Sequence, residues 1–412
     1  MEYQKLDEVA AAWGISTRRL QTLCAQGKII GATRFGRAWM IPKDAVKPRD
    51  GRTKMTLEEQ LAINMPLPRK TPFLYMTSLY DEPGCSERAI EALAGNHEAQ
   101  TLFAAEMAYS RGDIDKVYES ANYLLQKHSG FYAILSAGML LSLCAIWRGD
   151  LSMWRRAKIH ISEAPAKDDW EREIITLCIC SVDSRLYEVK DFPEWFKMGC
   201  FERLPMDSLP AAKVYYAKYL YAVAYGVASQ TFVMEGLSGF ALMRLLPATI
   251  EPMISQAMAD RTVIAEIYLR LSCAVAYHYS KNEEQAIRHI DKAIALALPD
   301  KFYGILAEYC RTIGGLLELR LKEADAGAWD AVDGMYKVYM ANWSKLNNSI
   351  TGRHIIASLT KQQREIARLA AFKLSDAEIG TRMHMSISGV KQAIRTIKQK
   401  SGLERDAFAA IL

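Results

Sequence analysis

The sequence contains few of the residues that characterise fibrous, low-complexity or disulfide-bonded chains. Its 412 residues include only 13 prolines and 24 glycines, and neither recurs regularly, which excludes collagen-like and low-complexity classes. The eight cysteines form no CxxC pair, so we expect reduced and mostly buried thiols in a cytoplasmic protein. The seven histidines are scattered, and none has ligand spacing from a cysteine pair, so no metal site is predicted.

Motifs of catalytic and nucleotide-binding sites are also missing. The sequence has no GxxxxGKS/T loop to hold a nucleotide, no HExxH and no GxSxG. Its acidic residues are spread over helical patterns without a close pair suited to acid–base catalysis. We therefore predict that the protein is not an enzyme and has neither catalytic residues nor a cofactor.

One apolar segment has nearly the length of a membrane span. Ser129–Trp147 is 19 residues without a charge. It contains three serines and two glycines, however, and it belongs to a repeat whose other copies carry charges. A buried helix is therefore preferred to a membrane span. The polar start of the chain lacks the apolar core of a secretory signal, which favours a cytoplasmic protein with no membrane partner.

Charge is distributed unevenly along a chain whose composition is that of a folded protein. Apolar residues make up 50% and charged residues 24%, and the length suggests two to four domains. Residues 1–54 and residues 353–412 each carry a net charge of +6, whereas the 298 residues between them carry −7. Two small basic modules thus flank an acidic body, which favours an anionic partner at both ends.

The C-terminal module has the pattern of short helices with defined starts. Ser375 and Ser386 are each placed to cap a helix, and only Met383–Met385 separate the two helices, which must therefore cross at a large angle. The second helix has an apolar row, and a basic row lies about 100° further round the helix. The apolar residues are Val390, Ile394 and Ile397, and the basic residues are Lys391, Arg395 and Lys398.

These features together predict a helix-turn-helix whose second helix faces DNA, rather than an ordinary solvated charged face. The module resembles the LuxR-type (GerE-type) DNA-binding domain, and the resemblance implies four short helices and dimers on inverted repeats. The matching segments are Leu359-Thr360, Glu365-Ile366, Ser375–Ile379, Met385-Ser386, Val390-Lys391 and Lys400–Leu403. The module departs from the family pattern at Gln362-Gln363, Gly389 and Ala393, so we expect an unusual target site. The predicted DNA contacts are Ser386, Ser388, Lys391, Gln392, Arg395 and Lys398.

The N-terminal module has a similar plan with an added hairpin. Leu6–Trp13 has one apolar helical face, Gly14 ends that helix, and Ser16 caps the next one. Two short strands, Thr33–Arg34 and Ala38–Ile41, are then expected around a tight turn at Gly36. The predicted DNA contacts are Thr17, Arg18, Gln21 and Thr22 on the second helix, with Arg34 and Arg37 beside the hairpin tip.

Residues 3–47 resemble the excisionase-like and MerR-like winged helix-turn-helix domains. The carriers are Leu6–Ala10, Trp13–Ser16, Arg18–Leu20, Gly27-Lys28, Gly36–Trp39 and Ile41-Pro42. The resemblance implies that the second helix enters the major groove and that the hairpin contacts phosphate or the minor groove. A structural cap with a solvated basic face is the alternative.

The acidic body consists of helical patterns with an internal repeat. Arg111–Ile114 recurs as Arg148–Leu151 after 37 residues, with a helix expected on either side of each copy. A looser copy is expected near Leu316–Ala326, and Pro247–Pro252 is expected to interrupt the series. The period resembles that of degenerate tetratricopeptide-type repeats, which implies a solenoid with a concave binding face. Tyrosines crowd one helix of this body, and core packing is preferred to a ligand pocket for each. They are Tyr215, Tyr216, Tyr219, Tyr221 and Tyr225.

The predicted fold is therefore mostly α, with a small β-hairpin in its N-terminal winged helix-turn-helix, a central α-helical repeat solenoid and a C-terminal four-helix LuxR-type module. The predicted domains are 1–47 (DNA-binding), 48–85 (proline-containing linker), 86–343 (helical-repeat sensor or dimerisation body), 344–356 (linker) and 357–412 (DNA-binding).

We expect a bacterial transcription regulator that binds double-stranded DNA as a homodimer. A small-molecule or peptide effector is a candidate partner of the body, and RNA polymerase is one if the protein activates. The alternatives are an architectural or recombination accessory DNA-binding protein and a helical-repeat adaptor for protein partners.

Overall fold

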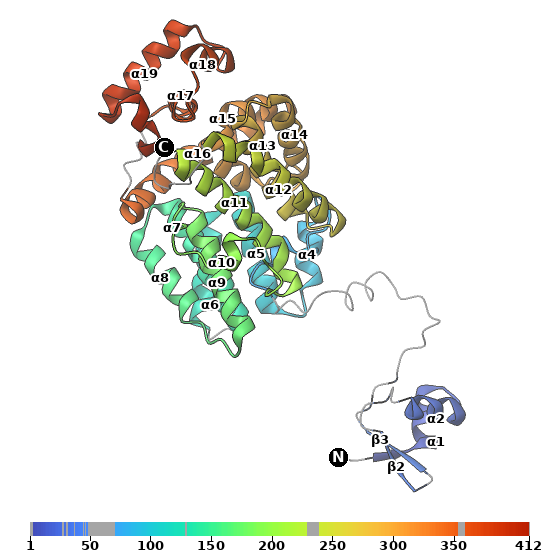
Figure 1. Cartoon of the computed structure of the whole chain (residues 1–412). Coiled ribbons are helices and arrows are strands. Elements are labelled where there is room, and N and C mark those ends of the chain that lie inside the picture. The colour runs from blue at the N-terminus through green and yellow to red at the C-terminus, as the bar shows by residue number, and fades with distance from the viewer. Residues whose placement is uncertain are drawn as a thin grey trace. The chain divides into compact units, whose positions relative to one another are not determined.

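Helices form most of the described chain, and one small antiparallel sheet accompanies them (Figure 1). The computed structural model describes residues 3–26, 29, 32–36, 38–43, 45, 47, 71–127, 130–228, 239–352 and 359–411. The chain divides into two compact units, Met1–Met65 and Pro66–Leu412. The prediction of a mostly α protein is confirmed.

The first unit combines two short helices with three strands. Its elements are β1 (Tyr3–Lys5), α1 (Leu6–Trp13), α2 (Thr17–Ala25), β2 (Thr33–Phe35) and β3 (Ala38–Pro42). The strands pair antiparallel in the order β1-β3-β2, and the predicted hairpin is thus present, with a third strand that the sequence pattern did not indicate. Gly14 ends α1 with φ of 59°, and Gly36 forms the hairpin turn with φ of 61°, both in the left-handed region that glycine adopts without strain.

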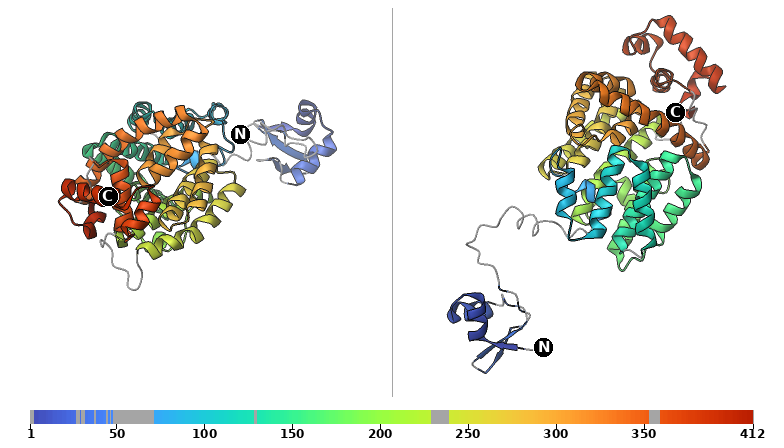
Figure 2. Two further views of the ribbon diagram at one scale, coloured as in Figure 1. Left: turned by 90° about the horizontal axis from the view of Figure 1, so that it is seen from above. Right: turned by 180° about the vertical axis from the view of Figure 1, so that it is seen from behind.

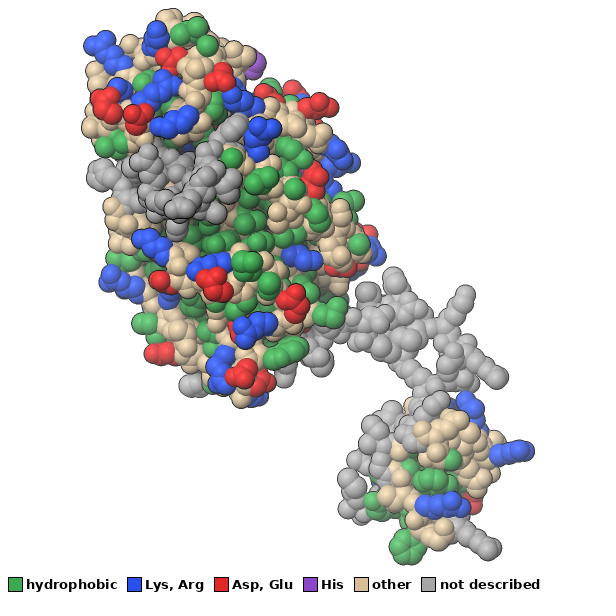
Figure 3. Space-filling model, viewed as in Figure 1, with side chains coloured by type: hydrophobic (Ala, Val, Ile, Leu, Met, Phe, Trp, Pro, Cys, Tyr) green, Lys and Arg blue, Asp and Glu red, His purple; other side chains and the backbone are tan. Residues whose placement is uncertain are grey.

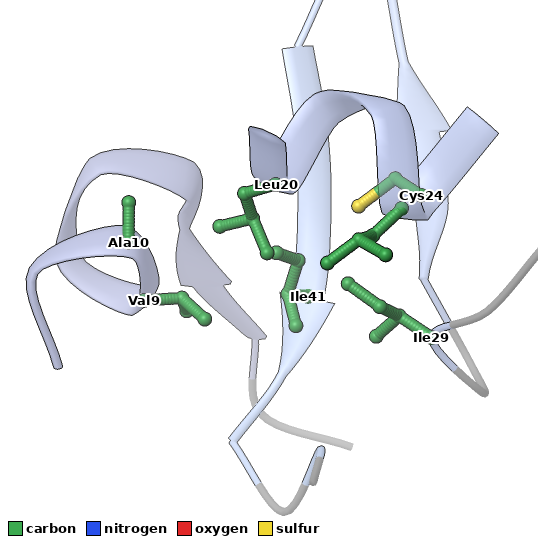
Figure 4. Close-up of a cluster of buried hydrophobic side chains, with 7 residues drawn as sticks. Val9, Ala10, Leu20, Cys24, Ile29 and Ile41 are labelled. Atoms are coloured by element: carbon green, nitrogen blue, oxygen red, sulfur yellow. The ribbon is translucent and has the colours of Figure 1, made fainter. Parts of the chain in front are cut away.

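A small hydrophobic core holds these elements together (Figure 4). Leu20 of α2 and Ile41 of β3 have no exposed surface, and Val9 of α1 packs in the same cluster. Each element therefore contributes the apolar side of an amphipathic pattern, and the opposite side stays in solvent. The rest of the buried cluster is Ala10, Leu23, Cys24 and Ile29.

The second unit begins earlier than the predicted boundary at residue 86. The expected linker of residues 48–85 is wrong at its C-terminal end, because Phe73, Tyr75 and Tyr80 are buried in the helical body around η1 (Leu74–Met76). The Tyr75 amide donates to Glu106 (2.9 Å) and the Tyr80 hydroxyl donates to Asp300 (2.6 Å), so apolar burial and polar contacts both fix this segment. The helix predicted for Thr56–Ile63 lies outside the described residues.

The body consists of successive helices that pack on their neighbours in the chain (Figures 1 and 2). α7 packs on α6 and α8, α13 packs on α12 and α14, and α15 packs on α16. The helices are α4 (Ser86–Ala92), α5 (His97–Arg111), α6 (Ile114–Gln126), α7 (Phe131–Arg148), α8 (Leu151–Ser162), α9 (Asp169–Ser184), α10 (Glu194–Lys197), α11 (Leu209–Ala228), α12 (Gly239–Ala259), α13 (Val263–Tyr279), α14 (Glu283–Ala297), α15 (Tyr303–Ala324) and α16 (Ala326–Thr351), with η2 (Met206–Ser208) before α11.

The two copies of the repeated motif form the same type of joint between helices. Gly112 and Gly149 end α5 and α7 with φ of 93° and 60°. Asp113 and Asp150 then cap α6 and α8, because each carboxylate accepts the third helical amide of its helix. The motif thus combines a stop signal and a start signal in adjacent residues, and the helices predicted on either side of each copy are present.

α7 contains most of the uncharged segment and is packed within the body. It is the one helix among the described residues that is long and apolar enough to cross a membrane, and 83% of its apolar window is buried inside the protein. The side chains of α5, α6, α8, α9 and α16 surround it. The prediction of a buried helix is therefore confirmed.

The end of the body also differs from the prediction, because the expected linker of residues 344–356 is helical up to Thr351 within α16. Its polar residues have partners: the side-chain amide of Asn347 donates to the Leu186 carbonyl (2.6 Å), and the Ser344 hydroxyl donates to the Met340 carbonyl (2.8 Å).

α15 contains a kink at a single non-helical residue, Ile313 (φ −129°, ψ 24°).

The C-terminal helices are α17 (Lys361–Ala371), α18 (Asp376–Arg382), α19 (Ile387–Ser401) and the 3₁₀ helix η3 (Arg405–Ile411). Thr360, Ser375 and Ser386 cap the three α-helices, and the predicted caps at Ser375 and Ser386 are therefore confirmed. α17 packs against both α19 and η3, and it also contacts α15 of the body.

Candidate nucleic-acid interface

α2 presents a polar face that the N-terminal core leaves uncovered. Ser16 caps the helix by accepting the Arg19 amide (3.2 Å), and this fixes where the first turn begins. Leu20, Leu23 and Cys24 turn inward. The four side chains predicted to contact DNA, Thr17, Arg18, Gln21 and Thr22, are all exposed on the opposite side.

The hairpin places exposed side chains beside its tip. Arg34 pairs with Trp39 across the β2–β3 ladder and is exposed, as predicted, whereas Arg37 lies outside the described residues. Phe35 is 83% exposed next to the turn, and sequence reasoning missed it. The sequence did contain a signal for this exposure. Phe35 lies at a tight turn between two arginines, and a residue at such a position is not expected to reach the core.

α18 and α19 meet at a tight turn that small residues allow. A Cβ on Gly380 would lie 2.8 Å from the Met385 carbonyl oxygen, so the turn can pass this close to α18 only because residue 380 is glycine. Val390, Ile394 and Ile397 are buried, as the apolar row predicted. This packing fixes which face of α19 points away from the core.

The predicted contacts on α19 are mostly exposed. Ser386, Ser388, Lys391, Gln392 and Arg395 are exposed, whereas Lys398 is half-buried and pairs with Glu404. Among the described residues, none pairs with the side chain of Lys391 or Arg395. Figure 3 shows several Lys and Arg side chains, with acidic ones among them, on the visible face of the C-terminal helices. The face is therefore polar, basic and uncovered.

A chain of polar contacts holds the opposite side of these helices to the body. Arg382 of α18 donates to His278 Nδ1 (3.3 Å), and His278 Nε2–H donates to Glu365 of α17 (2.7 Å). The rings of Tyr279 and Phe372 stack beside them at 5.0 Å. Burial alone would raise the pKa of Glu365, but the hydrogen bond from His278 and the charges of Arg368 and Arg382 outweigh it and lower the pKa. Glu365 therefore takes part in this contact as an ionised carboxylate.

A second contact between the body and α18 lies at the surface. Lys281, in the turn between α13 and α14, pairs with Glu378, which also accepts the Ser375 amide (2.8 Å) at the start of α18. The hydrogen bonds from Lys281 and Ser375 lower the pKa of Glu378 to about 2. The body thus contacts α17 and α18 and leaves the predicted DNA-facing side of α19 free.

The centre of the body contains a buried ionic group. Glu308 of α15 accepts from Arg185 (2.9 Å) and from Lys218 of α11 (3.1 Å). Burial raises the pKa of Glu308, but the two cations outweigh it and lower the value to about 2; burial and the neighbouring Arg185 lower the pKa of Lys218 to about 8. The adjacent cavity, about 60 Å³, is large enough for water but too small for an effector.

The tyrosines of α11 are mostly buried, and Tyr215 contacts this ionic group directly. Tyr215 donates or accepts a hydrogen bond with Tyr75 (3.2 Å) and accepts one from Arg185 (3.2 Å). Tyr216, Tyr221 and Tyr225 are also buried. The prediction of core packing is confirmed for these four, and Tyr219 is half-buried against Phe192 and Phe196.

One group of side chains has donors suited to a metal ion, although no metal site was predicted. Potential ligand atoms of Glu251, Cys273 and His289 lie within 4.8 Å of one another. A carboxylate, a thiolate and an imidazole are all ligand types that zinc accepts. However, burial raises the pKa of Cys273 to about 12, and burial and then Arg270 lower the pKa of His289, so the site disfavours both the thiolate and added positive charge.

Comparisons with protein-family models, curated proteins and solved structures gave no match. The proposed function therefore rests on the residues and geometry of the chain itself.

Proposed function

We propose that this chain is a cytoplasmic bacterial transcription regulator that binds double-stranded DNA through a module at each end. The N-terminal module is a winged helix-turn-helix of the excisionase or MerR type, and the C-terminal module is a LuxR-type helix-turn-helix. The body between them is a solenoid of degenerate tetratricopeptide-like repeats. It senses an effector or mediates dimerisation.

One observation carries the proposal: each end of the chain has a capped helix whose inner face is buried and whose outer face carries exposed cationic and amide side chains. No residue that the structure describes pairs with these side chains. On α2 these are Arg18 and Gln21, and on α19 they are Lys391, Gln392 and Arg395. Arginine and glutamine are suited to bidentate contacts with guanine and adenine, and lysine neutralises phosphate.

The proposed mechanism separates affinity from sequence choice. Phosphate contacts from both modules supply most of the affinity, and base contacts from α2 and α19 select the sequence. A ligand of the body regulates binding only if its affinity differs between two arrangements of the modules. As a homodimer, the protein presents up to four DNA-binding helices. It contacts RNA polymerase if it activates transcription.

Phe35 favours a second candidate, an architectural or recombination accessory protein. An aromatic side chain that is 83% exposed at a hairpin tip can enter the minor groove and unstack a base step. Such a protein bends DNA without a preference for promoters.

The deciding experiment is to incubate the purified full-length protein with sheared genomic DNA near physiological salt and to sequence the retained fragments. Sharp peaks upstream of genes support the regulator. Retention without sequence preference, together with bending of short duplexes that Phe35→Ala abolishes, supports the architectural candidate.

Salt dependence separates both candidates from a helical-repeat adaptor. Phosphate contacts give a log–log slope of about −0.9 per contact, so a DNA-binding protein loses affinity steeply with added salt. A slope near zero, measured by fluorescence anisotropy with a labelled duplex, contradicts both DNA-binding proposals.

A further inference from the structure

A cavity of about 320 Å³ lies between the body and the C-terminal helices, within the second unit. We call it the arginine cavity. Its volume is at the small end of the range of roughly 300–1,000 Å³ that ligand pockets occupy. The body contributes residues of α13, α14, α15 and α16, and the other wall comes from α17, α18 and the turn after α18. The lining residues used below are Arg311 and Gly315 on the body side, with Arg364, Glu365, Arg368 and Arg382 on the C-terminal side.

Cationic groups outnumber carboxylates in the interior of this cavity. Arg311, Arg364 and Arg368 are all buried, and their relative exposures are 4%, 6% and 1%. Glu365 is the one buried carboxylate among the lining residues, and His278 already donates to it. The remaining two acids are less enclosed: Glu283 is exposed, and Glu318 pairs with Lys322 (2.8 Å).

Two atoms of the most buried arginine lack a partner. Arg368 approaches Glu365 through Nη1 at 3.7 Å, whereas its Nε and Nη2 are buried and have no hydrogen-bond partner among the described residues. A buried guanidinium with unsatisfied donors is costly, because it has lost water without gaining an acceptor. Burial and the neighbouring charges of Arg368 and Arg311 also lower the pKa of Arg364, so the arginines repel one another within the cluster.

We propose that the arginine cavity binds a small organic anion whose carboxylate or phosphate group accepts hydrogen bonds from Arg368, with Arg364 and Arg382 beside it. Planar guanidinium groups bind both kinds of oxyanion in a bidentate manner. Because the two walls belong to the body and to the C-terminal helices, the bound anion links them. The anion therefore favours the arrangement in which α17 and α18 are held against α13 and α15.

The occupant is a small molecule and not the phosphate backbone of DNA. Arg368 is 1% exposed, so a stiff duplex cannot bring a phosphate within hydrogen-bond distance of it. The proposed DNA contacts on α19, such as Arg395, are exposed residues outside the cavity lining. The site is thus separate from the proposed DNA-facing surface.

The test is isothermal titration calorimetry of the full-length protein with two probes, inorganic phosphate and citrate, at constant ionic strength set with sodium chloride. Two variants address the site. Arg368→Gln removes the guanidinium, and Gly315→Phe fills the cavity but retains every arginine; a Cβ at Gly315 meets no atom within 4 Å, so the added ring has space. Arg288→Gln is the matched control, because Arg288 is exposed on α14 and is not part of the lining.

We expect one probe to bind the wild type and Arg288→Gln saturably, with one anion per chain. Binding of phosphate indicates a phosphate ester as the natural ligand, and binding of citrate indicates a carboxylate. We expect Arg368→Gln to weaken binding by about 10- to 100-fold and Gly315→Phe to abolish it. Circular dichroism without anion checks that each variant is folded.

The proposal is overturned if neither probe binds saturably, if Arg288→Gln weakens binding as much as Arg368→Gln, or if folded Gly315→Phe binds like the wild type. No DNA is present in these titrations, so a negative result leaves the proposed DNA-binding function untouched.

Discussion

Replacement of Arg18 in α2 or Arg395 in α19 breaks no side-chain hydrogen bond or ion pair with a described residue. Arg18 and Arg395 are exposed, and no described residue pairs with either side chain. We expect Arg18→Ala and Arg395→Ala each to weaken operator binding by about 1–3 kcal/mol, or roughly 5- to 150-fold, and to relax selection at one base position. Fluorescence anisotropy with the retained genomic sequence measures the affinity.

Arg155→Ala is the control for charge alone, because Arg155 is exposed on α8 of the body. If Arg155→Ala reduces affinity as much as the two test substitutions, the loss reflects net charge and not recognition. Unchanged affinity in Arg18→Ala and Arg395→Ala refutes the assignment of both recognition helices.

Lys218 gives the stability of the body a specific pH dependence. Its pKa is about 8 in the folded protein and near 10.5 when exposed, so between these values the unfolded chain binds protons that the folded chain does not. The contribution of Lys218 to the free energy of unfolding therefore rises with pH over this window. Buried thiols such as Cys144 and Cys273 contribute in the opposite direction, because burial raises their pKa to about 12 and the unfolded chain ionises first. The buried tyrosines Tyr268 and Tyr309 add to this loss near pH 10 for the same reason. We therefore expect urea denaturation to show that the free energy of unfolding of the wild type, relative to that of Lys218→Met, increases between pH 8 and 9.5.

Lys292→Met provides the comparison for this titration, since Lys292 is exposed on α14. It should retain the pH dependence of the wild type. If Lys218→Met has the same pH dependence as the wild type, Lys218 does not titrate in this range.

At the scale of elements, two glycines in helices predict opposite effects of the same substitution. A Cβ on Gly304, at the start of α15, would lie 2.5 Å from the Tyr109 carbonyl oxygen and 2.8 Å from the Gly112 amide nitrogen, so α15 and α5 would have to separate. A Cβ on Gly334, in α16, meets nothing within 4 Å. We expect Gly304→Ala to lower the free energy of unfolding by about 1–3 kcal/mol and Gly334→Ala to raise it by about 0.4–1 kcal/mol. Thermal denaturation followed by circular dichroism measures both, and a stable Gly304→Ala variant would contradict the close approach.

Local signals predicted the elements well where the cause was local. The caps at Ser375 and Ser386 were predicted correctly, and so were the helices on either side of the motifs at Arg111–Ile114 and Arg148–Leu151. The caps at Asp113 and Asp150 were not predicted, although they depend equally on local side chains. The exposed face of α19 followed from its apolar row for the same reason. Lys398 also lies on the basic row, but its ammonium group forms an ion pair with Glu404, which lies beyond the end of the helix.

Long-range contacts explain what the sequence did not reveal. Ser344–Thr351 looks like a linker by composition, yet Asn347 donates to Leu186, 161 residues away, and the helix continues. Pro247 and Pro252 both lie inside α12 and do not interrupt the body, because packing of α12 on α11 and α13 outweighs two lost helical hydrogen bonds. The arginine cavity likewise needs residues from helices that are far apart in the sequence.

For the whole molecule, the proposal of two DNA-binding modules predicts additive losses. Arg18 and Arg395 belong to separate units and share no partner. If both modules read one operator, Arg18→Ala combined with Arg395→Ala should lose the sum of the two single effects, within about 0.5 kcal/mol. The same anisotropy assay measures it. A double variant no weaker than the weaker single variant shows that only one module reads that DNA.

The kink at Ile313 in α15 is a point where motions of the body and of the C-terminal helices can be coupled. The Tyr279 hydroxyl donates to the carbonyl of Thr312 (2.8 Å), directly before the break in α15, while the Tyr279 ring stacks on Phe372 of the C-terminal helices. One side chain therefore connects the bend of a body helix to the C-terminal helices. Rearrangements of packed helices occur over microseconds to milliseconds. We expect relaxation-dispersion signals at Ile313 and Phe372 to share one exchange rate. A shared rate would mean that bending of α15 and separation of the C-terminal helices from the body are the same motion.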